Sequence, residues 1–116
     1  KMVISESRKA EMRENDLRIA EELKQKLSQA VQLLDFRVFG SRARGDADEY
    51  SDMDVFIEVE RLNPEISEKI EDVVWEVGFE NFMVISPLIF TRDEIKNTPL
   101  RSSPIVKNIT EEGVSV

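Results

Sequence analysis

Residues 39 to 59 read FGSRARGDADEYSDMDVFIEV, and this stretch decides both the fold and the candidate site. Its second half alternates as a strand over 52–59, so Asp52 and Asp54 share one face, about 6.5–7 Å apart along the chain. Apolar side chains take the opposite face, namely Met53, Val55 and Ile57. Two carboxylates at this spacing repel each other unless a cation lies between them, and oxygen ligands with open water positions suit Mg²⁺. The pattern predicts a magnesium site, with a solvated acidic strand end as the alternative.

A Gly-Ser turn ends the preceding strand, which we expect over 35–39. Backbone N–H groups exposed where a strand turns into a helix bind phosphate, and glycine allows a close approach. Gly40 and Ser41 are therefore interpreted as a phosphate-binding turn, with an ordinary turn as the alternative. Arg42 and Arg44 follow at once and can neutralise phosphate charge, unless they are solvated surface arginines.

The flanking sequence predicts helices and one further strand. We expect an amphipathic helix over 5–30, and a second helix that Asn63-Pro64 opens and that runs to about Gly78, with Trp75 in the core. An apolar strand buried on both faces is expected over 82–90. Two further helices are expected, one starting at the Thr91 capping box and one running from Ser103-Pro104 to Gly113. The order helix, strand, strand, helix, strand, helix, helix predicts an α/β (α+β) fold, a mixed β-sheet packed by helices, in a single domain over residues 1–116.

Composition excludes several classes of chemistry. The chain has no cysteine and no histidine, which removes disulfides, thiolate or imidazole metal sites and Ser-His-Asp or Cys-His catalysis. Its net charge of −8 disfavours general nucleic-acid binding, because phosphate contacts need Lys and Arg. No secretory signal and no membrane-spanning run is evident, so the cytoplasm is the expected location.

The spacing of these motifs resembles the DNA polymerase beta-like nucleotidyltransferase superfamily, most closely its minimal nucleotidyltransferases. Those proteins carry Gly-Ser, ten residues and then Asp-x-Asp, as Ser41 and Asp52 do here. The resemblance implies the nucleotidyltransferase fold, a triphosphate held by Gly40 and Ser41, and Mg²⁺ held by Asp52 and Asp54 as the catalytic pair. It implies transfer of a nucleoside monophosphate to a hydroxyl, with pyrophosphate leaving.

One departure from the family concerns its third carboxylate, which usually lies on a later strand. That strand here reads FMVISPLIF and contains no acid. By alternation Ser86 takes the third place, and serine brings neither the charge nor the basicity of a carboxylate. Glu58 and Glu80 are alternatives that the pattern places less well.

Two hypotheses of different class follow. The first is an active transferase that moves AMP from ATP to a partner protein, because small members of the family resemble the antitoxin of a toxin–antitoxin pair whose toxin is a helical HEPN-domain protein. The second is a nucleotide-binding module that neutralises a partner by covering its surface, which the missing third acid favours. An antibiotic-modifying enzyme ranks last, because those enzymes normally carry an additional helical domain.

Overall fold

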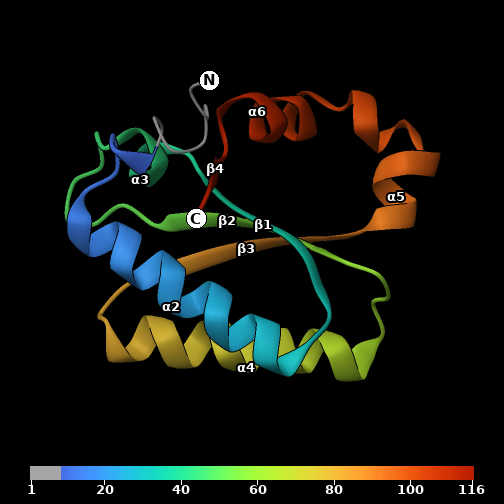
Figure 1. Ribbon diagram of the computed structural model, residues 1–116, viewed down its shortest axis with the longest axis horizontal. Coiled ribbons are helices and arrows are strands. Elements are labelled where there is room, and N and C mark those ends of the chain that lie inside the picture. The colour runs from blue at the N-terminus through green and yellow to red at the C-terminus, as the bar shows by residue number, and fades with distance from the viewer. Residues whose placement is uncertain (1–8) are drawn as a thin grey trace.

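The computed structural model describes residues 9–116, which form a four-stranded mixed sheet packed by helices (Figure 1). In chain order the elements are α2 (Glu14–Ala30), β1 (Leu33–Phe39), α3 (Ser41–Arg44), β2 (Met53–Val59), α4 (Pro64–Glu80), β3 (Ile85–Thr91), α5 (Arg92–Asn97), the 3₁₀ helix η1 (Pro99–Ser102), α6 (Pro104–Glu112) and β4 (Val114–Ser115). The strand order is β3-β2-β1-β4, with β2 and β3 parallel and β1 antiparallel to both its neighbours. The predicted α+β fold is confirmed.

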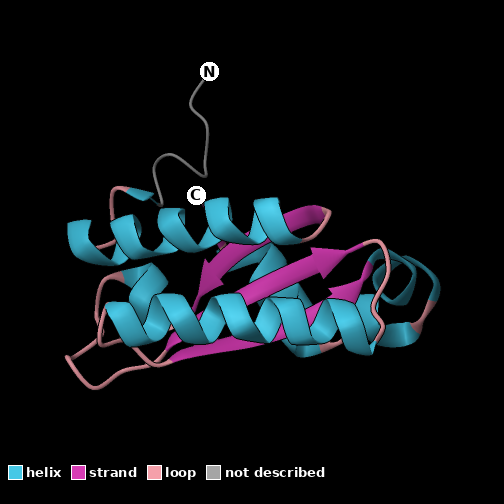
Figure 2. Ribbon diagram, turned by 90° about the horizontal axis from the view of Figure 1, so that it is seen from below, coloured by secondary structure: helices cyan, strands magenta, loops and turns pink. Residues whose placement is uncertain are grey.

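The sheet separates two layers of helices. Helices α2 and α4 cover one face, while α5 and α6 lie on the other side (Figure 1). Seen from below, α2 and α4 run side by side across the strands (Figure 2). None of the helices described between residues 9 and 116 is long and apolar enough to cross a membrane.

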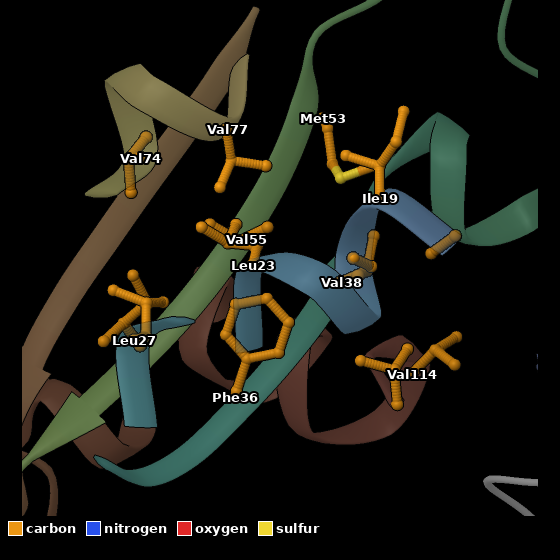
Figure 3. Packing of buried hydrophobic residues seen from close by; sticks show 14 of the residues in the cluster. Ile19, Leu23, Leu27, Phe36, Val38, Met53, Val55, Val74, Val77 and Val114 are labelled. Carbon is orange, nitrogen blue, oxygen red and sulfur yellow. The ribbon is translucent and has the colours of Figure 1, made fainter. Parts of the chain in front are cut away.

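The main core lies between the sheet and the α2–α4 layer (Figure 3). Helix α2 buries residues at helical spacing, as its periodicity requires. Strand β2 buries Met53, Val55, Ile57 and Val59 on its core face, and Phe56 is buried on the other face. The side chains that meet there include Ile19, Leu23, Leu27, Phe36, Val38, Val55 and Val77. Each fully buried aliphatic or aromatic side chain of this size contributes roughly 1.5–3 kcal/mol.

Two predicted helix starts are confirmed by their caps. The Asn63 side chain accepts a hydrogen bond from the amide of Ile66 at 2.8 Å, with Pro64 in the first turn of α4. At α5, Thr91 and Glu94 form a reciprocal capping box.

Other boundaries differ from the prediction. The expected helix over 5–30 begins, as α2, at Glu14, and residues 5–8 lie outside the described part. Helix α4 runs on to Glu80, so β3 begins at Ile85 rather than at residue 82. The prediction that this strand is buried on both faces was wrong, because β3 is the outermost strand and all its residues are partly exposed. Short elements η1 and β4 were not predicted.

The prediction of a buried Trp75 was also wrong, since Trp75 is 68% exposed. Successive helical residues are 100° apart. Val74 and Val77 lie on the buried stripe of α4, and Trp75 follows Val74 out of that stripe.

Candidate active site

The predicted site residues gather at one end of the sheet. The end of β1 lies beside the start of β2, with Phe39 opposite Asp54, because these strands are antiparallel. The start of β3 lies on the other side of β2, with Ser86 opposite Asp54, because those strands are parallel. Three chain segments that are distant in sequence therefore present Gly40, Asp54 and Ser86 together.

The two acids lie at the start of β2, away from the main core. Asp54 is partly buried and Asp52 exposed, whereas Met53 and Val55 between and beyond them are fully buried. Burial, and then the charge of Asp52, raises the pKa of the Asp54 carboxyl above its usual value. A cation bound here would offset both effects, because it favours the charged form of the carboxyl.

Gly40 packs directly against the Asp54 carboxylate. Its backbone has φ 76° and ψ −159°, a conformation that is essentially restricted to glycine. A Cβ at this position would lie 2.6 Å from Asp54 Oδ2, so the Asp54 carboxylate would have to move to admit a side chain. The turn and the Asp54 carboxylate therefore lie directly against each other.

The turn opens into the single helical turn α3. The amides of Ala43 and Arg44 donate to the Gly40 carbonyl at 3.1 and 3.2 Å. The amides of Ser41 and Arg42 precede these first intrahelical bonds and belong to the free donors of a helix start. Such donors, next to two carboxylates, suit an anion that arrives with a metal ion.

Arg42 lies in the interior rather than on the surface that the sequence suggested. Its guanidinium donates through Nη1 to Asp16 Oδ1 and Oδ2 at 3.0 and 3.2 Å, and the two side chains are only 6% and 3% exposed. Nε and Nη2 donate to the Ser51 carbonyl at 3.2 and 2.8 Å, and Nη2 also to the Glu49 carbonyl at 3.5 Å. Arg42 thus joins α2 to the loop that ends at Asp52.

Asp16, the buried partner of Arg42, is the residue beside the candidate site that sequence reasoning missed. It occupies the apolar face of α2, between buried Met12 and buried Ile19. A carboxylate is almost never fully buried without a partner. An acid on that apolar face could have predicted that a basic side chain from elsewhere in the chain is buried beside it.

Arg44 differs from Arg42 because it is exposed. Its Nε lies 3.2 Å from Asp46 Oδ2, in an ion pair whose two side chains are more than half accessible to solvent. Exposed pairs of this kind contribute only about 0–1 kcal/mol. Arg44 is therefore available to an incoming phosphate.

Ser86 occupies the place predicted for it. Its hydroxyl donates to Asp52 Oδ2 at 3.2 Å. The two alternative acids are engaged elsewhere: Glu58 accepts from Arg92 Nε at 2.8 Å, and Glu80 accepts from Lys26 Nζ at 3.4 Å. The third position beside the acids is thus a hydroxyl.

The donor set fits magnesium bound together with a nucleotide. Within residues 9–116, no group of three or more His, Cys, Asp or Glu side chains is arranged to hold a metal ion. Mg²⁺ is commonly bound through one or two carboxylates plus substrate phosphates, with water completing the shell. Asp52 and Asp54 would contribute two carboxylates to such a set, and a triphosphate would supply the rest.

Comparison with known families agrees with this geometry. The family of nucleotidyltransferase domains matches residues 18–116, so the chain belongs to it. Membership makes the chain a nucleotidyl transferase by class, with a nucleoside triphosphate as substrate and a divalent metal as the usual cofactor. The comparison with curated proteins gave no match.

Proposed function

We propose that this chain transfers AMP from ATP to a hydroxyl of a partner protein, with Mg²⁺ as cofactor. The observation that carries the proposal is the contact of the Gly40 turn with Asp54 at the end of the sheet where Asp52 and Ser86 also lie. Membership in the nucleotidyltransferase family supplies the reaction class. The base and the metal are parts of the proposal, supported by the resemblance and by the oxygen-only donor set.

Asp52 and Asp54 would hold the metal, which neutralises charge on the triphosphate and on the leaving group. The Ser41 hydroxyl and the first amides of α3 would bind the phosphates, with exposed Arg44 closing on them. A direct phosphate contact from Arg42 stays a prediction that its burial does not favour, and we assign Arg42 a positioning role.

The reaction is a displacement at the α-phosphorus of ATP. The acceptor oxygen forms a bond to the α-phosphorus while the bond between that phosphorus and the α–β bridging oxygen breaks. The electron pair of the broken bond leaves on pyrophosphate. The acceptor proton passes to water or to a group of the acceptor, since the Ser86 hydroxyl is no base at neutral pH. In-line transfer of this kind depends mainly on positioning and charge stabilisation.

The acceptor is proposed to be a protein, because the acids open onto the surface at the end of the sheet. Asp52 is exposed, and its neighbour Ser86 is at least partly so. The resemblance to minimal nucleotidyltransferases supports a HEPN-domain toxin as that protein, with this chain as the antitoxin. A single domain over residues 1–116 and a cytoplasmic location complete the proposal.

A second candidate is a nucleotide-binding module that covers its partner without chemistry. Ser86 in place of a third acid favours it, because a positioned proton acceptor typically contributes 10²–10⁴-fold in rate. In that case nucleotide binding would change the affinity for the partner and no group would be transferred.

The test uses ATP labelled on its α-phosphate, Mg²⁺ and the product of the neighbouring gene, which the proposal expects to be a HEPN-domain protein. The proposal expects label on the HEPN protein with the wild-type chain and none with Asp54→Asn. The binding module predicts a stable, nucleotide-dependent complex with no label. If neither label nor a complex were detected, both candidates would be rejected.

A further inference from the structure

An apolar groove lies between α4 and β3, on the face of the strand opposite the acids. It encloses about 640 Å³, and we name it the α4–β3 groove after its lining, which includes Val74, Trp75, Phe79, Phe82, Val84 and Pro87. Ile85 and Pro87 face this groove, while Ser86 between them bonds to Asp52. The groove is therefore separated from the candidate active site by the thickness of one strand.

The groove exposes aromatic side chains to an unusual extent. Trp75 and Phe79 are 68% and 69% exposed and stack with ring centroids 5.0 Å apart. Phe82 is 97% exposed. Contiguous exposed apolar surface of this kind marks interaction sites, and Trp and other aromatics are prominent among the residues that anchor interfaces.

Phe82 lies just beyond the C-terminal end of α4. Phe82 has φ 52°, and among the non-glycine residues described it alone has a positive φ. This left-handed residue ends α4, where the Phe82 amide donates to the Phe79 carbonyl at 3.4 Å and the Met83 amide to the Gly78 carbonyl at 2.9 Å. Glycine is the usual residue at such a helix end, and this chain instead has an aromatic ring there that lies outside the core.

Glu71 lines the groove, and Glu68 and Asp72 lie close to it on the same helix, so we name these three residues the acidic rim. At 100° per residue these three carboxylates lie on the same side of the helix as Trp75 and Phe79. All three are exposed, and within the described residues none of them takes part in an ion pair. The rim is therefore free to meet positive charge.

We propose that the α4–β3 groove docks a basic amphipathic α-helix of another protein. The apolar stripe of the partner helix would cover Trp75, Phe79 and Phe82, and the Lys and Arg side chains of that helix would face the acidic rim. A second copy of this chain fits poorly, because a symmetric contact would place the acidic rim against itself in a chain of net charge −8. Strand addition at β3 also fits poorly, because Pro87 removes a backbone donor from this edge strand.

Docking in the α4–β3 groove requires no nucleotide and no transfer, so it is independent of the proposed function. A helix in the groove would still lie one strand away from Asp52 and Asp54. The surface would thus hold an acceptor protein, or a neutralised one, close to the nucleotide.

The experiment uses Trp75, the single tryptophan of the chain, as its reporter. The probe is a synthetic helix of about 15–20 residues, built from Leu at helical spacing and Lys elsewhere, with a Glu-for-Lys version as its control. The Lys peptide should shift Trp75 emission to shorter wavelength at saturation, and added salt should weaken the binding. The Glu peptide should cause no such shift.

Variants localise the contact. Phe82→Ser and Glu71→Lys should each weaken Lys-peptide binding about tenfold. The matched controls Tyr50→Ser, an exposed aromatic residue elsewhere, and Glu111→Lys, an exposed acid on α6, should bind as wild type does. Asp54→Asn should also bind normally, which separates this surface from the nucleotide site.

Three results would overturn the proposal. One is equal binding of the Lys and Glu peptides. Another is equal weakening by the groove variants and their controls. The third is an emission shift that follows protein concentration without peptide and disappears in Phe82→Ser, which would assign the groove to a second copy.

Discussion

Replacing Asp16 by Asn tests whether the buried pair with Arg42 supports the candidate site. Asn keeps the size of the side chain but removes the negative charge that compensates a guanidinium only 6% exposed. Removing one partner of a buried ion pair typically costs 3–5 kcal/mol. The carbonyls of Ser51 and Glu49 still accept from Arg42, so we expect the lower end, about 3 kcal/mol.

A loss of that size is large for a small domain, whose total stability is about 5–15 kcal/mol. At roughly 4 °C per kcal/mol it lowers the midpoint of thermal unfolding by about 12 °C. Circular dichroism during heating and during urea titration at pH 7 measures both quantities. We also expect weaker binding of Mg·ATP, because Arg42 fixes the Ser51 carbonyl next to Asp52.

Glu14→Gln is the matched control, because Glu14 is the exposed acid of the same first turn of α2. It makes the same change from carboxylate to amide near the same helix dipole, which contributes about 0.3–1 kcal/mol. If Asp16→Asn destabilised the protein no more than Glu14→Gln, the buried pair would have no special structural role and the reasoning would be refuted.

Three further substitutions probe the site itself. Without metal at pH 7, Asp54→Asn should unfold at a higher temperature than wild type. Because the pKa of Asp54 is raised, its contribution to stability is complete below the ordinary Asp pKa of about 3.9 and is lost as pH rises through the raised pKa. The unfolding temperatures of the two proteins should therefore converge in acid, and a gap that stays constant with pH would contradict this. Gly40→Ala should lower the free energy of unfolding, measured in urea, by about 1–3 kcal/mol, since the new Cβ would lie 2.6 Å from Asp54 Oδ2. It should also abolish Mg·ATP binding measured by calorimetry, and normal binding would show that the turn is not part of the site. Ser86→Asp should tighten metal binding and raise any turnover up to about 10²–10⁴-fold, and an unchanged rate would show that the third acid is not what limits transfer.

Local patterns in the sequence predicted the part of the site that lies on strands. Alternation over 52–59 placed Met53 in the core and the acids opposite it, because a strand repeats every two residues. The position of Ser86 was right although β3 begins three residues later than predicted. Because side chains alternate between the two faces along the whole strand, the face assigned to Ser86 was correct even though the predicted start of the strand was not.

Contacts between distant segments could not be read in the same way. The pair of Asp16 and Arg42 joins residues 26 apart, and no local periodicity encodes that partner. The apolar run of β3 predicted burial, but the strand order makes it an edge, and hydrophobicity alone does not distinguish a core strand from one beside an open groove. Trp75 failed for the same reason, because its apolar character suits a docking surface as well as a core.

The most direct test of the central claim is a crystal structure of the chain with a non-hydrolysable ATP analogue and Mn²⁺, in which anomalous scattering locates the metal. The account predicts a metal peak bound by the carboxylates of Asp52 and Asp54, at metal–oxygen distances of about 2.1 Å. It also predicts triphosphate oxygens on the amides that follow Gly40. A metal peak away from both acids, or phosphates remote from residues 40–44, would contradict it.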